Sequence, residues 1–288
     1  MTAEALDIRP AGTSPAQLRS YESLLNASFA TGKFNEAAIA WRYRDNPAGQ
    51  VVGADAWDGE RLAAHYVTCP LEARIDGRVV RGLLSMNTAT HPDYQGRGLF
   101  TRLAEAAYAA GAAAGYGFVI GVANANSTPG FLRKLGFQDV GRLEAGILAT
   151  LPRRFSDAAV QYQGAWRSEL LRWRLANPDG RYLAAHYGQL VGVWARTQLP
   201  FVKCAAFLPG EAAALDLGET VGRGAPLAAT LFLGLEPRAA LTRHGFMAIP
   251  ESLRPSPLNL IWRALGEGAP GALSRDAVAI NFLDFDPY

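Results

Sequence analysis

One stretch of the sequence joins an extended apolar run to a helical pattern through two closely spaced glycines. The extended run ends at Thr90, a turn follows, and Gly96 and Gly98 precede a helix that periodicity places from Leu99. The first amides of a helix lack intrahelical acceptors and carry the positive end of the helix dipole, so they attract anions. Glycines allow successive loop amides to face the same anion. The stretch therefore predicts a binding site for a phosphate or pyrophosphate group.

Two common phosphate-binding patterns do not fit this loop. A Walker loop requires GxxxxGK[ST], and a dinucleotide-binding loop requires GxGxxG with an acidic residue about 20 positions later. Neither pattern occurs here. The loop must therefore belong to another class of phosphate site.

The loop closely resembles the cofactor-binding motif of the GNAT superfamily of N-acetyltransferases, a strand followed by HPxY[RQ]GxG and a helix. Residues 94–98, Tyr-Gln-Gly-Arg-Gly, match the centre of that motif. Asn126 and the segment Phe131–Phe137 resemble the later Asn and (Y/F)xKxGF elements of the family. Both motifs occur in the family's order, and the resemblance covers roughly residues 5–149. It implies an acyl-CoA-dependent acyltransferase.

The resemblance implies a CoA site formed by the strand end, the loop and the start of the helix. Backbone groups near residues 87–90 would hold the pantetheine arm, and the amides of residues 95–100 would hold the pyrophosphate. Arg97 and Arg102 either contact phosphate or lie solvated, and Asn126 either bonds the pantetheine arm or caps the next helix. The expected cofactor-binding residues are Asn87, Thr88, Ala89, Thr90, Gln95, Gly96, Arg97, Gly98, Leu99, Phe100, Thr101 and Asn126.

The catalytic residues cannot be assigned from the motif. Amine attack on a thioester requires a neutral amine, a donor for the developing oxyanion and a proton for the departing thiolate. Many family members supply that proton from a tyrosine, but Leu132 stands at the matching position, and Gly82 stands near the place of the glutamate base of some relatives. Candidates by chemistry are Ser85, His65, Tyr94 and Asp284, with His91 and Asp286 beside them.

All of these candidates except Ser85 also have a structural interpretation. His91 and Tyr94 are typical of a turn that supports the loop, and His65 lies within an apolar run, where a core or groove position is expected. Residues 281–288 alternate apolar and acidic side chains, which predicts a half-exposed strand. The tail carboxylates would then either lie at a sheet edge or bind the amine.

Hydrophobic periodicity supplies the elements around this loop. It predicts helices over about 15–30, 35–44, 99–114 and 129–135, and strands over about 6–9, 51–57, 62–67, 71–75, 79–90 and 118–122. Asp58-Gly59 and Asp76-Gly77 separate the strands as hairpin turns do. The strand after Gly115 is expected to separate from the strand before the loop, leaving a slot for thioester and acceptor. We expect an α/β mixed sheet, a GNAT fold with a second GNAT-like domain.

Two short segments recur in the same order. Trp41–Gly49 recurs with one deletion as Trp173–Gly180, and Phe131–Phe137 resembles Ala240–Phe246. Repetition in order favours a duplicated unit, although chance remains the alternative. We predict a catalytic domain over residues 1–150 that binds acyl-CoA, and a degenerate GNAT-like domain over residues 151–288 that shapes the acceptor site.

Composition excludes several classes of partner. The 288 residues include 28 basic and 26 acidic side chains, a net charge of +2 that argues against a nucleic-acid surface. Two cysteines and four scattered histidines favour neither a disulfide framework nor a metal site. No signal segment or long apolar run is recognisable, so we expect no membrane contact and a cytoplasmic, bacterial protein.

The sequence thus predicts an N-acyltransferase that uses acetyl-CoA or another acyl-CoA and acts on a small-molecule amine. A nucleotide-linked aminosugar is one candidate acceptor. A Fem-type aminoacyl transferase is an alternative, but it requires a basic tRNA surface and lacks the CoA loop. A non-catalytic acyl-CoA-binding sensor is the other alternative, which Leu132 favours. The assembly state stays open, with a homodimer as one option.

Overall fold

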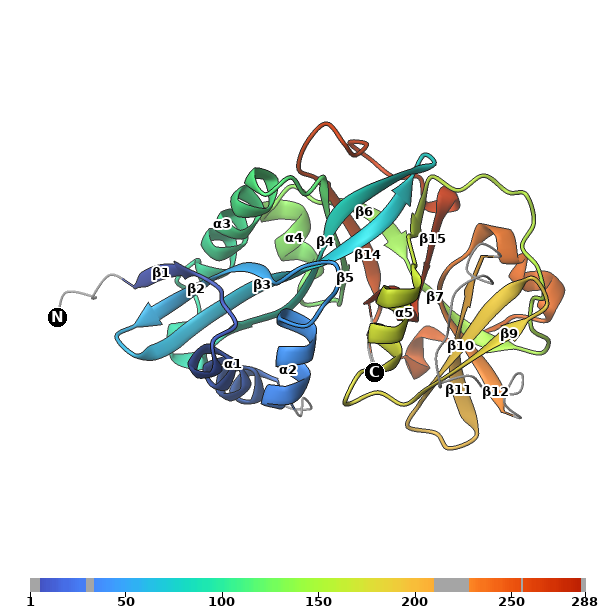
Figure 1. Ribbon diagram of the computed structural model, residues 1–288, viewed down its shortest axis with the longest axis horizontal. Helices are drawn as coiled ribbons and strands as arrows, with labels where there is room; N and C mark the ends of the chain where they lie inside the picture. The colour runs from blue at the N-terminus through green and yellow to red at the C-terminus, as the bar shows by residue number, and fades with distance from the viewer. Residues whose placement is uncertain (1–5, 30–33, 210–227, 255, 286–288) are drawn as a thin grey trace.

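A single mixed sheet runs through the molecule (Figure 1). The structure is a computed structural model that describes residues 6–29, 34–209, 228–254 and 256–285. Within these ranges fifteen strands hydrogen-bond into one sheet, with helices on both faces of its first part. The predicted α/β mixed sheet is confirmed.

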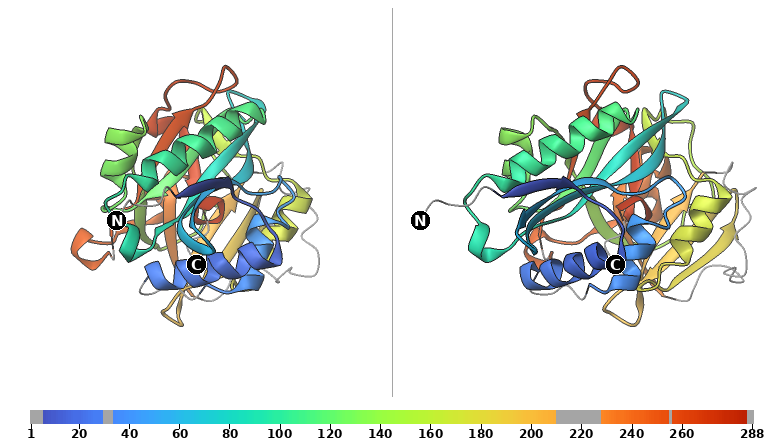
Figure 2. Two further views of the ribbon diagram at one scale, coloured as in Figure 1. Left: turned by 90° about the vertical axis from the view of Figure 1, so that its left-hand side faces the viewer. Right: turned by 60° about the vertical axis from the view of Figure 1, so that its left-hand side comes forward.

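The first half of the chain contributes the helix-covered part of the sheet. Helices α1 and α2 pack on one face of it and α3 and α4 on the other (Figure 2). The strands are β1 (Asp7–Pro10), β2 (Val52–Asp58), β3 (Arg61–Ile75), β4 (Arg78–Thr90), β5 (Phe118–Ala123), β6 (Gln138–Arg142) and β7 (Glu144–Leu148). The helices are α1 (Pro15–Ser28), α2 (Glu36–Tyr43), the 3-10 turn η1 (Pro92–Tyr94), α3 (Leu99–Ala113) and α4 (Thr128–Lys134).

Local signals explain where α1 begins. Ser14 and Gln17 form a capping box, and Pro15 occupies the first helical position, where its missing N–H is harmless. Leu18 and Tyr21 belong to the apolar face, which is buried against the sheet. The helix predicted here is confirmed, as are the three that follow it in the first half.

Strand β3 corrects one expectation. The predicted strands 62–67 and 71–75 form one continuous strand that passes through Pro70. Pairing with β2 ends at Thr68, and pairing with β8 begins at Ala73, so one edge of β3 has no strand partner at Pro70. A residue without an N–H is tolerated at such a place.

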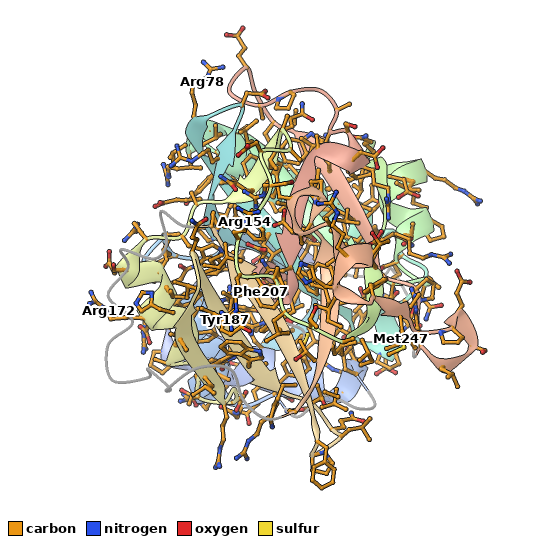
Figure 3. All side chains as sticks on the ribbon, turned by 90° about the vertical axis from the view of Figure 1, so that its right-hand side faces the viewer. Arg78, Arg154, Arg172, Tyr187, Phe207 and Met247 are labelled. Atoms are coloured by element: carbon orange, nitrogen blue, oxygen red, sulfur yellow. The ribbon has the colours of Figure 1, made fainter. Side chains whose placement is uncertain are left out.

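The second half of the chain forms the remainder of the sheet. In Figure 3 it faces the viewer, and the labels mark Tyr187 of β9 and Phe207 of β11, two strands that both pair with β10. Its strands are β8 (Tyr162–Gly164), β9 (Tyr182–Tyr187), β10 (Leu190–Arg196), β11 (Val202–Leu208), β12 (Ala229–Leu235), β13 (Met247–Ala248), β14 (Asn259–Ala264) and β15 (Val278–Asn281). Its helices are α5 (Ser168–Leu175), α6 (Phe282–Phe285) and the 3-10 turns η4 (Pro237–Ala239), η5 (Leu241–His244), η6 (Glu251–Leu253) and η7 (Arg275–Ala277).

The two halves repeat one strand order and exchange one strand each. Strands β9, β10 and β11 form an antiparallel meander like β2, β3 and β4, and β12 joins β11 in parallel as β5 joins β4. Strand β14 of the second half lies between β5 and β6, and β7 of the first half lies between β12 and β13. A cut at residue 150 would therefore separate each half from a strand that completes its sheet. The division of the chain into two domains stays a proposal.

The repeated sequence segments meet across the two halves. The indole rings of Trp41 and Trp173 stack with centroids 4.4 Å apart and planes inclined by 17°. Each Nε1 donates a hydrogen bond to the backbone carbonyl oxygen of the other tryptophan, both at 3.2 Å. This reciprocal geometry is what a local twofold axis produces, and it favours duplication over a chance recurrence.

The end of the chain differs from the predicted half-exposed strand. Strand β15 ends at Asn281, and the chain continues as the short helix α6, whose apolar side chains are buried. The Oδ1 of Asn281 accepts a hydrogen bond from the N–H of Leu283, and the Oδ2 of Asp284 accepts one from the N–H of Asn281. These reciprocal bonds start the helix as a capping box does. Asp286 lies outside the described residues.

Candidate functional site

Strands β4 and β5 separate at the centre of the first half. Their parallel pairing runs from Gly82 opposite Phe118 to Ser85 opposite Gly121 and then stops. A cavity of about 400 Å³ opens there, as the sequence predicted. Its walls come from the residue after α1, from β4, α3, β5, α4 and β14, and from the turn between β5 and α4. They comprise Phe29, Ser85, Met86, Asn87, Thr88, Phe100, Gly121, Val122, Ala123, Asn124, Asn126, Ser127, Gly130, Phe131 and Ile261. We call it the cleft cavity.

A second cavity of about 240 Å³ adjoins the first, and we call it the rear cavity. The two share Ser85, Met86, Asn87 and Val122, so they meet where the strands separate. The other walls of the rear cavity are Arg42 of α2, Leu84, Leu258 and Phe285. The second half of the chain therefore closes one side of it.

A β-bulge shapes β4 at this junction. The register between β3 and β4 shifts between His65 and Val67, so that residues 87 and 88 have no strand partner of their own. Asn87 has a φ of +48°, a left-handed conformation that asparagine adopts more readily than most residues. A bulge releases backbone polar groups from the ladder. Residues 87 and 88 can therefore offer them to a ligand in the cleft cavity.

The glycine loop has the conformation that an anion site needs. Gly96 and Gly98 have φ values of +77° and +71°, and Gly98 immediately precedes α3. A Cβ atom added at either position would meet no atom within 4 Å, so the backbone conformation alone requires glycine. The predicted residues 95–98 thus form an exposed loop, and residues 99–101 form the start of α3, where Leu99 is buried.

Two of the catalytic candidates support this loop. The side chain of His91 accepts a hydrogen bond from the N–H of Asp93, and Tyr94 donates one to Asp58 at 2.5 Å. Tyr94 is buried, and the hydrogen bond to Asp58 is the main reason its pKa is raised. Neither residue lines the cleft cavity or the rear cavity. The geometry supports the structural interpretation of both.

The two predicted arginines lie on the surface beside the loop. The guanidinium of Arg97 lies 5.0 Å from the centre of the Tyr94 ring and donates to the carbonyl oxygen of Asp93. Arg102 is exposed on the first turn of α3. Both are placed where a phosphate held by the loop could be reached.

Ser85 is the catalytic candidate that lies in the cavities. Its Oγ is 2.8 Å from the Oη of Tyr66, which is 2.5 Å from the Oη of Tyr108. Burial raises the pKa of Tyr66 to about 12 and the pKa of Tyr108 further. Both phenols therefore stay protonated at neutral pH, and Ser85 ends a chain of three hydroxyl groups.

His65 and Asp284 lie outside both cavities. His65 is fully buried, with Nδ1 2.6 Å from the Oδ1 of Asp55 and Nε2 3.2 Å from the Oη of Tyr43. Asp284 accepts a hydrogen bond from the Nε1 of Trp166, and burial raises its pKa from 3.8 to about 6. It lines a separate cavity of about 40 Å³.

Sequence reasoning missed Asn124. Its Oδ1 accepts hydrogen bonds from the N–H groups of Asn126 and Ser127, both at 3.0 Å, and so forms the turn before α4. Asn126 is thereby left to face the cleft cavity. An asparagine two residues before the expected one was the available signal. Leu132 does not line either cavity, whereas its neighbour Phe131 does.

The structure brings only part of the predicted cofactor set into the cleft cavity. Asn87, Thr88, Phe100 and Asn126 line it, and the glycine loop leads to it through α3. Phe29 and Ile261 also line it, and they lie far away in sequence, so no motif could have identified them.

Metal and membrane features can be stated only for the part of the chain that the structure describes. There, no group of three or more His, Cys, Asp or Glu side chains is placed to hold a metal ion. No described helix is long and apolar enough to cross a membrane.

Comparison with known proteins identifies the first half. Residues 8–140 match the family model described as an acetyltransferase (GNAT) domain. The chain carries a GNAT acetyltransferase domain. This domain belongs to a family of acyl-CoA-dependent N-acyltransferases, and the resemblance seen in the glycine loop is confirmed. None of the curated proteins compared with the chain matches it.

Solved structures extend the GNAT fold beyond the matched domain. A GCN5-related N-acetyltransferase from Kribbella flavida is 16% identical with a TM-score of 0.61, covering 92% of this chain and 72% of that one. A GCN5-related N-acetyltransferase from Anabaena variabilis is 9% identical with a TM-score of 0.58, covering 90% and 73%. A probable N-acyltransferase from Enterococcus faecalis is 9% identical with a TM-score of 0.56, with the same coverage. At these identities the likeness concerns the fold alone.

Proposed function

We propose that this protein is a cytoplasmic acetyl-CoA-dependent N-acetyltransferase whose acceptor is a small-molecule amine. The observation that supports this most is the cleft cavity, which opens at the end of the β4–β5 pairing and lies between the β4 bulge and the glycine loop. Geometry of this kind lets one extended ligand bind by its phosphates at one end and react at the other.

The residues present fit an acyl-CoA. The amides of residues 95–100 suit its pyrophosphate, and the backbone groups freed at residues 87 and 88 suit the amides of its pantetheine arm. Phe100 and Phe131 supply apolar walls between the two. The thioester supplies the acyl group, and this arrangement would place it near Ser85 and Gly121.

The rear cavity is the proposed acceptor site. Its volume of about 240 Å³ suits a small molecule better than a protein side chain with its backbone. Arg42 at its wall favours an amine that also carries a phosphate or carboxylate, as a nucleotide-linked aminosugar does. Leu258 and Phe285 close it from the second half, which is the role proposed for residues 151–288.

Ser85 is the proposed partner of the departing sulfur. With Leu132 outside both cavities, the Ser85 hydroxyl is the nearest group of its kind at their junction. The raised pKa of Tyr66 keeps a proton available behind it for hydrogen bonding. We assign Ser85 a hydrogen bond to the developing thiolate. Full proton transfer is not assigned, because Tyr66, the group that would have to replace the proton of Ser85, has a high pKa and is a weak acid.

One observation favours a second function, an acyl-CoA-binding sensor without transferase activity. Leu132 removes the acid that the family normally uses, and a sensor would need the CoA site alone. The Fem-type alternative is not favoured, because the glycine loop has the conformation of a phosphate site.

Titration calorimetry with acetyl-CoA and coenzyme A tests the proposal. Gly98→Trp should abolish binding, whereas the matched control Gly77→Trp, at φ +80° in an equally open hairpin turn, should bind like the wild type. An amine panel monitored by thiol release then separates enzyme from sensor. Absence of binding by folded wild-type protein would refute both, and binding without transfer to any amine would favour the sensor.

A further inference from the structure

A chain of buried polar groups ends at the junction of the two cavities. The Nδ2 of Asn87 donates to the Oη of Tyr43 at 3.0 Å, and Tyr43 lies 3.2 Å from the Nε2 of His65. The Nδ1 of His65 lies 2.6 Å from Asp55, which also accepts the hydroxyl of Tyr21 at 2.7 Å. All of these residues except Asn87 expose 0% of their surface. The chain therefore links a fully buried network to one cavity-lining side chain.

The donors and acceptors of this network have one consistent direction. A carboxylate only accepts, so the Nδ1–H of His65 and the hydroxyl of Tyr21 donate to Asp55. If His65 is neutral, its other ring nitrogen carries no hydrogen and accepts from the hydroxyl of Tyr43. Burial raises the pKa of Tyr43, so this hydroxyl keeps its proton. The Oη of Tyr43 accepts in turn from the amide nitrogen of Asn87. The carbonyl oxygen of Asn87 is thereby left as the group that the side chain offers to the cavities.

We propose that the Oδ1 of Asn87 accepts a hydrogen bond from the attacking amine, and that Tyr43, His65 and Asp55 are positioning residues that hold it there. This inference rests on the proposed function. Asn87 lines both the cleft cavity and the rear cavity, which places it where thioester and amine meet. Its left-handed backbone and the bulge fix the base of the side chain, and Tyr43 fixes its end.

The chemistry explains why an acceptor at this place would accelerate the reaction. The nitrogen lone pair forms the N–C bond, and the electrons of the C–S bond leave with sulfur. The nitrogen becomes positive during this step, so its N–H donates more strongly in the transition state than in the free amine. The proton finally lost by nitrogen balances the one that sulfur gains as it becomes the thiol. Asn87 holds the nucleophile and exchanges no proton itself.

The test compares two tyrosines of the same network. Tyr43→Phe and Tyr21→Phe each remove one buried hydroxyl bonded to the Asp55–His65 pair, but only Tyr43 contacts Asn87. We expect Tyr43→Phe to lower kcat/KM for the amine about 10- to 100-fold and Tyr21→Phe to lower it by less than about threefold, with unchanged acetyl-CoA affinity in both. If both variants lost the same activity, in proportion to the same loss of thermal stability, the network would have a structural role only and the inference would be wrong.

Replacing Asn87 itself separates the amine from the cofactor. Asn87→Gly tolerates the left-handed backbone and removes the whole side chain, including the carboxamide. We expect kcat/KM for the amine to fall about tenfold or more, with the acetyl-CoA Kd unchanged. A weaker acetyl-CoA Kd with an unchanged KM for the amine would make Asn87 a pantetheine ligand and overturn the inference.

A readout independent of activity distinguishes this inference from the proposed function. Hydrogen exchange of the Asn87 side-chain amide, followed by NMR, should be slow in the wild type and in Tyr21→Phe, and fast in Tyr43→Phe. Slow exchange in all three proteins would refute the role of Tyr43. If the exchange follows the expectation but wild-type protein acetylates no amine, the amine contact fails together with the proposed function, while the orientation of Asn87 stands.

Discussion

The two halves of the molecule differ at the point where their parallel strand pairs, β4–β5 and β11–β12, stop pairing. In each half four parallel pairs lie side by side, and the last pair is Ser85 opposite Gly121 in the first half but Ala205 opposite Phe232 in the second. The first half has a cavity of about 400 Å³ beyond this pair. In the second half Phe232 is 1% exposed and packs with Trp194 and other core residues.

The difference shows how little separates a site from a core in this fold. A glycine and a hydroxyl at the last pair leave room for a ligand, whereas an aromatic ring at the same place supplies apolar packing. The room at Gly121 is narrow, because a side chain there would begin 3.3 Å from Ile261 and 3.4 Å from Ser85. The repeated topology alone therefore does not carry the function.

Replacing Gly121 with the phenylalanine found at the corresponding place in the second half should close the cleft cavity. We expect Gly121→Phe to abolish detectable acetyl-CoA binding, because the ring would project into the cleft cavity. Phe232 fills the corresponding place in the second half in this way. Calorimetry measures the binding, and circular dichroism checks the fold. Gly121→Ala, which adds only one methyl group, should bind more weakly than wild type but still bind. Undiminished affinity in Gly121→Phe would place the cofactor elsewhere.

The reverse change is the control. Phe232→Ala should lower the free energy of unfolding by about 3–5 kcal/mol, since it leaves a hole in a packed core. Chemical denaturation measures the loss. The acetyl-CoA Kd of this variant should equal that of wild type below the transition. A marked loss of affinity would mean that the second half supports the cofactor site directly.

Replacing Asp284 tests whether the half-buried carboxylate of the second half has a structural role. Burial raises its pKa from 3.8 to about 6, so the folded protein binds this proton more tightly than the unfolded chain. The stability contributed by this group is present below about pH 4 and is lost as the pH rises towards 6. We expect Asp284→Asn to gain up to about 3 kcal/mol relative to wild type between pH 4 and pH 7.

Urea titrations across that pH range measure the difference, and kcat should stay unchanged. A stability difference between the two proteins that does not vary with pH would contradict the raised pKa of Asp284. A loss of kcat without a loss of stability would instead restore Asp284 as a catalytic candidate.

Replacing Ser85 should have the smallest effect of these substitutions. Ser85→Ala makes the last pair of the first half resemble Ala205 of the second. We expect kcat to fall about tenfold with little change in the acetyl-CoA Kd, because one hydrogen bond to the departing sulfur is lost. Steady-state kinetics with thiol detection measures it. An unchanged kcat would show that the sulfur leaves without help from this hydroxyl.

Short-range features were the ones that could be predicted. Capping signals and apolar periodicity placed α1 and α3, and the Asp-Gly turns placed the β2–β3 and β3–β4 hairpins. Strand β3 was predicted as two strands in error, because a proline normally interrupts a strand. The sequence does not show that β3 lacks a partner strand at one edge beside Pro70, which is why the proline is tolerated there. The tail was read as a strand because alternation cannot show that both faces of a segment are buried.

The glycine loop and the GNAT resemblance of the first half could be recognised from the residues alone, because the positive φ angles and the helix start depend only on neighbouring residues. The exchange of β7 and β14 and the hydrogen-bond network that ends at Asn87 could be found only in the folded chain. Asn87 and Tyr43 are 44 residues apart in the chain. Strand β14 pairs with β5 although β6 to β13 lie between them in the chain. Contacts of this kind depend on how sheets close and which side chains are buried together, which no local pattern records.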